Sequence, residues 1–110
     1  MTEITSYHAH VYYDAPATID QARKLCEGAG KRFKLTVGRM HDKPVGPHPR
    51  GSCQLAFAPD QFAAVIPWLI LNRSGLTVFA HANTGDALTD HTAHVVWLGP
   101  SETLDLSKLD

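Results

Sequence analysis

Alternating apolar and polar residues predict several short β-strands along the chain. Residues 6–13 alternate and are rich in aromatic side chains, a pattern typical of a strand. The same alternation recurs downstream and predicts four further strands, at 33–37, 53–57, 76–82 and 94–98. The chain therefore holds enough strands for one small sheet.

The segment between the first two predicted strands has the periodicity of a helix. Apolar residues recur at helical spacing over 18–28, where Thr18 and Gln21 have the form of a capping box. Gly28 and Gly30 then supply the residue type that commonly ends a helix. We therefore predict a helix over 18–28 that stops at these glycines.

A second helix is predicted over 59–72, because Pro59 is favoured at a first helical position and apolar residues follow it. Pro67 inside this segment predicts a kink or a restart, and Gly75 ends it. The segment 41–51 is too rich in proline and glycine for regular structure, so we expect a long loop there.

The order of these elements predicts the fold. Strand, helix, strand, strand, helix and strand, followed by one extra C-terminal strand, is the split βαβ pattern of ferredoxin-like α+β domains. Such a sheet is antiparallel, its helices cover one face, and its first strand lies beside the third and the fourth. With 110 residues and no linker or internal repeat, the chain is predicted to form a single domain over 1–110.

Composition narrows the possible partners. Ten Lys and Arg residues against eleven Asp and Glu residues give a net charge of −1, which argues against nucleic acid or an anionic membrane as partner. The longest apolar run, 62–71, is too short to span a bilayer and contains Pro67. The chain opens without a signal-peptide pattern, and Cys26 and Cys53 lack a CxxC spacing. We expect a cytoplasmic protein with two free thiols.

Histidine is the residue type that points to chemistry, because seven histidines occur beside only three glutamates. Strand alternation places His8, His10 and His81 on one face of the predicted sheet. Neighbouring strands lie about 4.8 Å apart, so these imidazoles converge. His48 and His91 lie in loops that we expect to fold over the same face. Neutral imidazoles bind iron, zinc, copper and nickel, so the pattern indicates a metal site, with solvated histidines as the alternative.

A carboxylate ligand is harder to place. Only Asp86 and Asp90 lie in a loop near the expected face, whereas the glutamates fall at a terminus, a helix end and the tail. Two ligand sets remain open: two histidines with one carboxylate, or histidines alone with the aspartates orienting their rings. His41 is expected on the surface, and His94 in a structural hydrogen bond.

Several short motifs in a fixed order resemble the DOPA 4,5-dioxygenase family of small bacterial and fungal ring-cleaving enzymes. They are the segments 8–13 (HAHVYY), 46–49 (GPHP), 81–86 (HANTGD), 90–92 (DHT) and 97–99 (WLG), which extend over almost the whole chain. The resemblance implies a ferredoxin-like fold, a homodimer, and extradiol cleavage of a catechol such as L-DOPA with non-haem Fe(II) and O₂. The alternative to Fe(II) is that a purified sample contains zinc or another divalent metal.

The resemblance, together with position on the sheet face or in the long loop, gives individual residues expected roles. The expected metal ligands are the residues that match recurrent family histidines, His10, His48 and His81. The expected catalytic residues are His91, His8 and Tyr12; His91 matches a fourth recurrent family histidine, as either a ligand or an acid/base. The expected substrate-binding residues are Arg50, Gln54 and Arg39, since a guanidinium fork suits a substrate carboxylate. Whether His8, Asp86 or Asp90 also binds the metal stays open.

Two other functions remain alternatives. One is a ferredoxin-like dimer that binds zinc or another metal and has a non-oxygenase activity. The other is a non-catalytic dimer that binds a small ligand, with histidines lining its pocket. Oxygen uptake with a catechol separates the dioxygenase from both, and a stoichiometric metal ion separates the first alternative from the second.

Overall fold

A five-stranded antiparallel sheet lies at the centre of the computed structural model, which describes residues 2–109. Its strands are β1 (Ser6–Tyr13), β2 (Thr36–Val37), β3 (Gly51–Phe57), β4 (Val78–Asn83) and β5 (Val95–Leu98). They lie in the order β2-β3-β1-β4-β5. β1 pairs with β3 and with β4, as the split βαβ pattern predicts, and β5 extends the sheet beyond β4.

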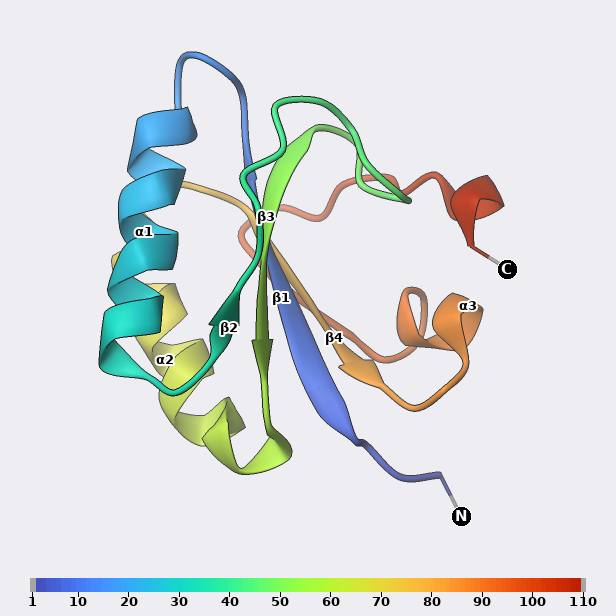
Figure 1. Cartoon of the computed structure of the whole chain (residues 1–110). Coiled ribbons are helices and arrows are strands. Elements are labelled where there is room, and N and C mark those ends of the chain that lie inside the picture. The colour runs from blue at the N-terminus through green and yellow to red at the C-terminus, as the bar shows by residue number, and fades with distance from the viewer. Residues whose placement is uncertain (1, 110) are drawn as a thin grey trace.

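Two helices cover one face of this sheet. α1 (Ile19–Arg32) and α2 (Phe62–Asn72) lie on the left in Figure 1, and the 3-10 turn η1 (Pro59–Gln61) leads into α2. On the other side lie the one-turn helix α3 (Ala87–Asp90) and the C-terminal segment with the 3-10 turn η2 (Leu106–Lys108). The prediction of an α+β fold with its main helices on one face is therefore confirmed.

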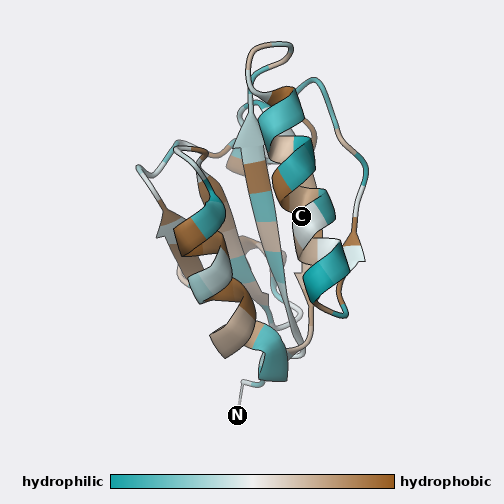
Figure 2. Cartoon of the chain, turned by 90° about the vertical axis from the view of Figure 1, so that its left-hand side faces the viewer, coloured by the Kyte–Doolittle hydropathy of each residue, from teal (hydrophilic) through white to brown (hydrophobic). Residues whose placement is uncertain are grey.

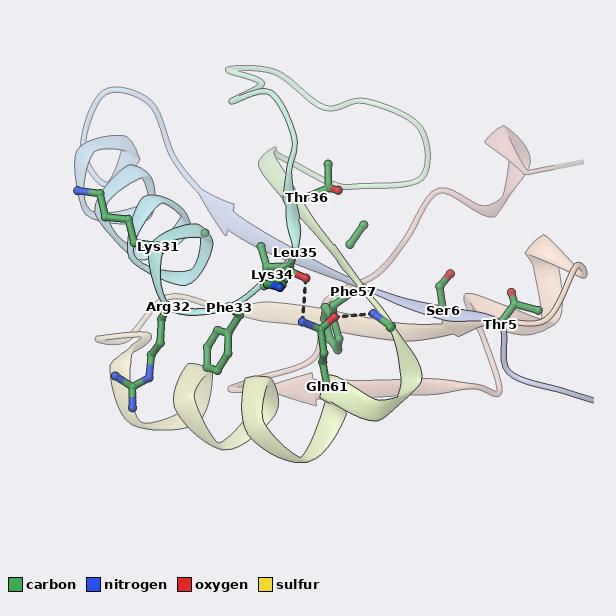
Figure 3. A pocket seen from close by; sticks show the side chains of 13 residues that line it. Thr5, Ser6, Lys31, Arg32, Phe33, Lys34, Leu35, Thr36, Phe57 and Gln61 are labelled. Carbon is green, nitrogen blue, oxygen red and sulfur yellow. Dashed lines mark hydrogen bonds between the residues drawn. The ribbon is translucent and has the colours of Figure 1, made fainter.

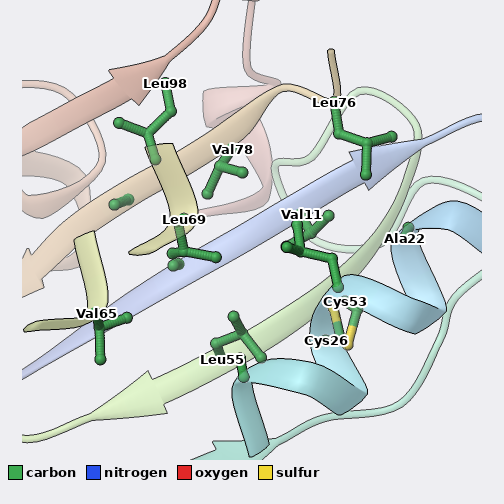
Figure 4. Close-up of a cluster of buried hydrophobic side chains, with 14 of the residues drawn as sticks. Val11, Ala22, Cys26, Cys53, Leu55, Val65, Leu69, Leu76, Val78 and Leu98 are labelled. Atoms are coloured by element: carbon green, nitrogen blue, oxygen red, sulfur yellow. The ribbon is translucent and has the colours of Figure 1, made fainter. Parts of the chain in front are cut away.

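The hydrophobic core fills the space between the two long helices and the sheet. Alternation along β1 turns Ala9, Val11 and Tyr13 toward the helices, and all three are fully buried. Leu69 of α2 packs into the same cluster with Leu55 of β3 (Figure 4). Because this face of β1 is committed to the core, the alternate residues of β1 are left for the opposite face.

α2 is apolar along most of its length, in contrast to the mixed colouring of α1 (Figure 2). Val65 and Leu69 are buried, whereas Ile70 and Leu71 remain exposed. The helix continues through Pro67, which lies on its exposed side, so the restart considered there does not occur. Within residues 2–109 there is no helix whose length and apolar character would let it cross a membrane.

α1 extends past both glycines that were expected to end it, so that prediction was wrong. A Cβ atom on Gly28 would lie 3.4 Å from the Trp68 ring, and one on Gly30 would lie 2.8 Å from a methyl group of Val37. The glycines therefore allow α1 to approach α2 and β2 closely, and the helix ends only at Arg32.

The capping box expected at the start of α1 does not form. The Thr18 side chain makes no bond to the first turn, and its hydroxyl oxygen instead accepts from the Asp14 amide at 2.8 Å. Gln21 donates from Nε2 to the Ser74 carbonyl at 2.5 Å. This side chain ties α1 to the turn after α2, a long-range contact that the local motif did not reveal.

The structure of two further segments, those that hold β2 and α3, also differs from the sequence-based prediction. β2 has two residues instead of five, because Phe33 and Leu35 pack against the core from outside the ladder. α3 forms where a loop was expected. Its start is capped by Asp86, whose carboxylate accepts from the Thr89 amide at 3.2 Å.

Both cysteines are buried in the core as free thiols, as predicted. Cys26 of α1 is 1% exposed and Cys53 of β3 is 0% exposed. Their sulfur atoms lie next to each other (Figure 4), and the Cys53 thiol donates to the Gly38 carbonyl at 3.5 Å.

Candidate metal centre

Three histidines converge on the sheet face that α1 and α2 leave open. His8 of β1 lies directly across the ladder from His81 of β4, and His10 follows on the same side of β1. The Nε2 atoms of His10 and His81 are 3.1 Å apart. One ring nitrogen of each of the three lies within 4.8 Å of the others, which makes them the one group among residues 2–109 suited to share a metal ion.

Two further histidines reach this face from loops, where the sequence placed them. The His48 ring, just before β3, has its centroid 4.0 Å from that of His10. The His91 ring, just after α3, has its centroid 4.1 Å from that of His81. The His8 ring meets those of His10 and His81 edge to face, with centroid distances of 5.8 and 5.2 Å.

Aromatic side chains line the base of this cluster. Phe79 of β4 is fully buried, and its ring centroid lies 5.5 Å from that of His81 and 6.0 Å from that of His10. Trp97 of β5 packs on Phe79 at 4.5 Å. Strand alternation puts Phe79 on the same face of β4 as His81, two residues later, so its position in the sequence is a usable signal for this contact.

Burial keeps the clustered imidazoles neutral. It lowers the pKa of His10 well below the usual value, and the neighbouring imidazoles add to this effect. Burial is also the main reason why the pKa of His48 and that of His81 fall to about 4. The pKa of His8 is lowered for the same reason. These four rings therefore offer lone pairs near neutral pH, the state in which imidazole binds a metal.

Hydrogen bonds fix which nitrogen carries the proton in two of the rings. A carbonyl oxygen only accepts, so Nδ1 of His81 donates to the Ala82 carbonyl at 3.1 Å, and Nδ1 of His91 donates to the Ala87 carbonyl at 2.7 Å. In the neutral rings Nε2 then carries the lone pair. His81 thus presents Nε2 toward His10, and His91 retains Nε2 as a proton acceptor.

Tyr12 sets the proton position of a third ring. Its hydroxyl lies 2.8 Å from Nδ1 of His48 and has no other acceptor among the described residues. Burial, with a contribution from the Glu102 carboxylate, raises the pKa of Tyr12, so the phenol stays protonated. Tyr12 therefore donates to Nδ1, which leaves the proton of neutral His48 on Nε2.

The aspartates considered as ligands are engaged elsewhere. Asp90 is 2% exposed and accepts hydrogen bonds from the Thr84 amide at 2.7 Å, the Thr84 hydroxyl at 2.6 Å and His94 Nδ1 at 2.8 Å. Asp86 caps α3. His94 is thus a structural histidine, as expected, and His41 forms an isolated bridge with Ser52. The donor set at the cluster is imidazole alone among residues 2–109.

A cavity of about 430 Å³ adjoins the cluster. His10 and His48 line it on one side, and Gln54 and Arg39 also face it. Two of the three residues expected to bind substrate therefore lie at one cavity beside the histidines. Substrate contact by Arg39 and Gln54 stays a prediction.

Arg50, the third expected substrate-binding residue, is held in ion pairs outside this lining. Its guanidinium donates to both carboxylate oxygens of Glu102, at 2.7 and 3.1 Å, and to Asp14 at 3.0 Å. It lies 5.9 Å from the centroid of the Tyr12 ring. Glu102 was expected away from this face, but the C-terminal segment returns it there, and the Asp105 amide donates to the Pro47 carbonyl at 2.9 Å.

A larger cavity lies elsewhere, at the end of α1 beside β2 and η1 (Figure 3). It measures about 930 Å³, and residues 31–34 form part of its wall. Gln61 crosses it, donating to the Lys34 carbonyl at 2.8 Å. It is open to solvent and no histidine lines it, whereas the smaller cavity is lined by both His10 and His48 of the cluster.

The fold and this site define a ferredoxin-like α+β protein with a buried histidine cluster suited to a metal ion. The sequence profile of the Dopa 4,5-dioxygenase family matches residues 7–108, nearly the whole chain. The protein therefore belongs to the Dopa 4,5-dioxygenase family, and the resemblance noted from its motifs is confirmed.

Two fungal proteins illustrate this relationship. The DOPA 4,5-dioxygenase of Amanita muscaria is 30% identical over 116 aligned residues, covering 98% of this chain and 51% of the fungal protein. A 21.2 kDa protein of Botryotinia fuckeliana, named as uncharacterized, is 40% identical over 95 residues, covering 78% of this chain and 52% of its own length. The chain thus spans about half the length of these curated relatives.

A solved structure shares the fold almost in full. The crystal structure of a candidate dioxygenase from Nostoc punctiforme PCC 73102 superimposes with a TM-score of 0.93. The two proteins are 50% identical, and the match covers 96% of this chain and 91% of the Nostoc chain.

Proposed function

We propose that this protein is an extradiol dioxygenase that cleaves the ring of a catechol with Fe(II) and O₂. The observation that carries the proposal is the set of three neutral histidines, His8, His10 and His81, beside an open cavity in a chain of this family. Extradiol cleavage needs a metal site and, beside it, room for a small aromatic diol. The histidine cluster and the adjoining cavity support the proposal on these two points.

The donor set fits a divalent iron ion. His10 and His81 present ring nitrogens 3.1 Å apart, and burial keeps both rings neutral. We assign His8 as the third ligand in place of His48, because a ring nitrogen of His8 lies within 4.8 Å of those of His10 and His81, whereas Nδ1 of His48 is bound by Tyr12. When bound, Fe(II) supplies Lewis acidity toward the catechol oxygens and open positions for catechol and O₂.

The two remaining histidines of the cluster act as a proton acceptor and a hydrogen-bond donor. Nε2 of His91 carries a lone pair, since its Nδ1 donates to Ala87, and it accepts the proton of a catechol hydroxyl. Neutral His48 keeps its proton on Nε2 at the cavity wall and donates a hydrogen bond from it to a developing oxygen charge, while Tyr12 fixes the ring through Nδ1. His10 and Phe79, 4% and 0% exposed, keep water from this side of the site.

The proposal is tested by adding L-DOPA and simple catechols in air to protein loaded anaerobically with Fe(II). We expect O₂ uptake that matches the appearance of a yellow ring-opened product. His10→Ala and His81→Ala should lose both metal and turnover, whereas His94→Gln, outside the cluster, should keep both. Full metal content and turnover in both cluster variants would rule out the proposed site.

The all-imidazole donor set also favours a second candidate, a zinc protein with a non-oxygenase activity, because zinc accepts three histidines as readily as iron does. Metal content and oxygen uptake separate the two. One tightly held metal ion per chain, with no O₂ consumed with any catechol after iron loading, would favour zinc chemistry.

We also propose that the protein forms a homodimer. β5 is an edge strand of the sheet, and its Val96 is 39% exposed, beside the exposed Ile4 at 44%. An apolar edge of this kind suits a second copy of the chain. Light scattering coupled to gel filtration measures the mass in solution, and a mass of one chain at micromolar concentration would contradict the proposal.

A further inference from the structure

The cavity beside His10 and His48 has an uneven distribution of charge. Arg39, just after β2, is the one arginine or lysine that lines it, and none of its lining residues is acidic. Gln54 and Ser52 add neutral polar groups. A ligand that fills this cavity therefore meets imidazoles and one guanidinium, and no carboxylate.

Arg39 is free to bind a ligand. Within residues 2–109, no carboxylate lies within ion-pair distance of its guanidinium, and it makes no side-chain hydrogen bond. Arg50, by contrast, is bound by Glu102 and Asp14. The backbone next to Arg39 is fixed, because the Gly38 amide donates to the Gln54 carbonyl at 2.7 Å.

We propose that this cavity takes a catechol whose side chain ends in a carboxylate and carries no ammonium group, with Arg39 as the residue that pairs with the carboxylate. This inference rests on the proposed function, and it names the class of substrate. A guanidinium binds a carboxylate through two parallel hydrogen bonds. The α-ammonium group of an amino acid would enter the same cavity facing Arg39, with no acidic side chain in the lining to receive it.

The size of the cavity agrees with this substrate class. A volume of about 430 Å³ lies within the usual range of small-molecule sites, and it suits an aromatic ring with a short side chain. With the diol at the histidines, the side chain extends along the wall that Gln54 and Arg39 share.

The inference is tested by comparing dihydrocaffeate, L-DOPA and 4-methylcatechol as substrates of the iron-loaded protein. We expect kcat/KM for dihydrocaffeate to exceed that for L-DOPA by about tenfold. Arg39→Gln should lower kcat/KM for dihydrocaffeate at least about tenfold more than for 4-methylcatechol, and Arg39→Lys should restore part of the loss. Arg23→Gln, an exposed arginine on α1, is the matched control and should change neither value.

A second readout does not depend on turnover. Titration calorimetry of the metal-free protein with hydrocinnamate, which has the carboxylate but no diol, should show binding that Arg39→Gln weakens about tenfold and Arg23→Gln leaves unchanged. Binding of this kind without cleavage of any catechol would overturn the proposed function while supporting the carboxylate site. Equal kcat/KM for L-DOPA and dihydrocaffeate, or hydrocinnamate binding that is the same in Arg39→Gln, would overturn the inference.

Discussion

The ion pair between Arg50 and Glu102 anchors the C-terminal segment next to the histidine cluster, and Glu102→Gln removes its charge with little change in shape. Both carboxylate oxygens accept from the guanidinium, at 2.7 and 3.1 Å. Asp14 remains beside Arg50 in the variant, so the guanidinium keeps one partner. The substitution therefore measures the contribution of the segment's attachment and not the cost of an isolated charge.

The magnitude follows from the exposure of the pair. The Arg50 and Glu102 side chains are 29% and 25% exposed, between a solvent-screened pair and a buried one. Exposed pairs contribute about 0 to 1 kcal/mol, and well-formed charged hydrogen bonds about 1.5 to 3 kcal/mol. We expect Glu102→Gln to lower the free energy of unfolding by about 1 to 2 kcal/mol, and Tm by roughly 4 to 8 °C.

Urea denaturation at neutral pH gives the free energy, with Asp20→Asn as the matched control. Asp20 pairs with Arg23 on the outer surface of α1, where the side chains are 83% and 44% exposed, so its loss should cost no more than about 0.5 kcal/mol. The reasoning is refuted if the two variants lose the same stability. Such a result would mean that the C-terminal segment is not held by this pair in solution.

Three further predictions concern the helix packing, the histidines and the ligand set. Gly28→Ala should raise the free energy of unfolding by about 0.5 to 1 kcal/mol, whereas Gly30→Ala should lower it, because its Cβ would meet Val37 at 2.8 Å; urea denaturation of both variants checks the difference. The pKa of His48 and that of His81, about 4 when folded, lie below the unfolded value of 6.5, so the unfolded chain binds more protons between these values. The metal-free protein should therefore lose stability as the pH falls from 6.5 to 4, by at most about 1.4 kcal/mol per pH unit for each histidine. Unfolding curves measured over this pH range give the slope of the free energy of unfolding against pH. An equal slope in the His48→Gln/His81→Gln double variant would contradict this prediction. His8→Ala should lower metal affinity more than His48→Ala does, and the reverse order in equilibrium dialysis would restore His48 as the third ligand.

Strand alternation was enough to predict the centre of the site. A side-chain period of two put His8 and His10 on one face, and the split βαβ order put β4 beside β1, so His81 had to come near them. The same rule puts Ala9 and Val11 on the opposite face, where they join the core. These predictions succeed because they depend on a regular geometry that few other sequence features can override.

The contacts that refine the site depend on long-range packing, which local patterns do not contain. Glu102 lies far along the chain from Arg50, and nothing in the polar tail marks its return. Gly28 and Gly30 resemble a helix end locally, but α2 and β2 make them positions of close approach. The tautomer of His48 likewise depends on its contact with Tyr12, which no spacing in the sequence encodes.

The burial of both cysteines has a chemical consequence if the protein acts on catechols, as we propose. Catechols oxidise in air to quinones, and quinones alkylate accessible thiolates. Cys26 and Cys53, the only cysteines of the chain, are 1% and 0% exposed in the core between α1 and β3, and burial is the main condition that keeps a thiol unreactive. The folded protein thus offers no thiol to the reactive by-products of its own proposed substrates.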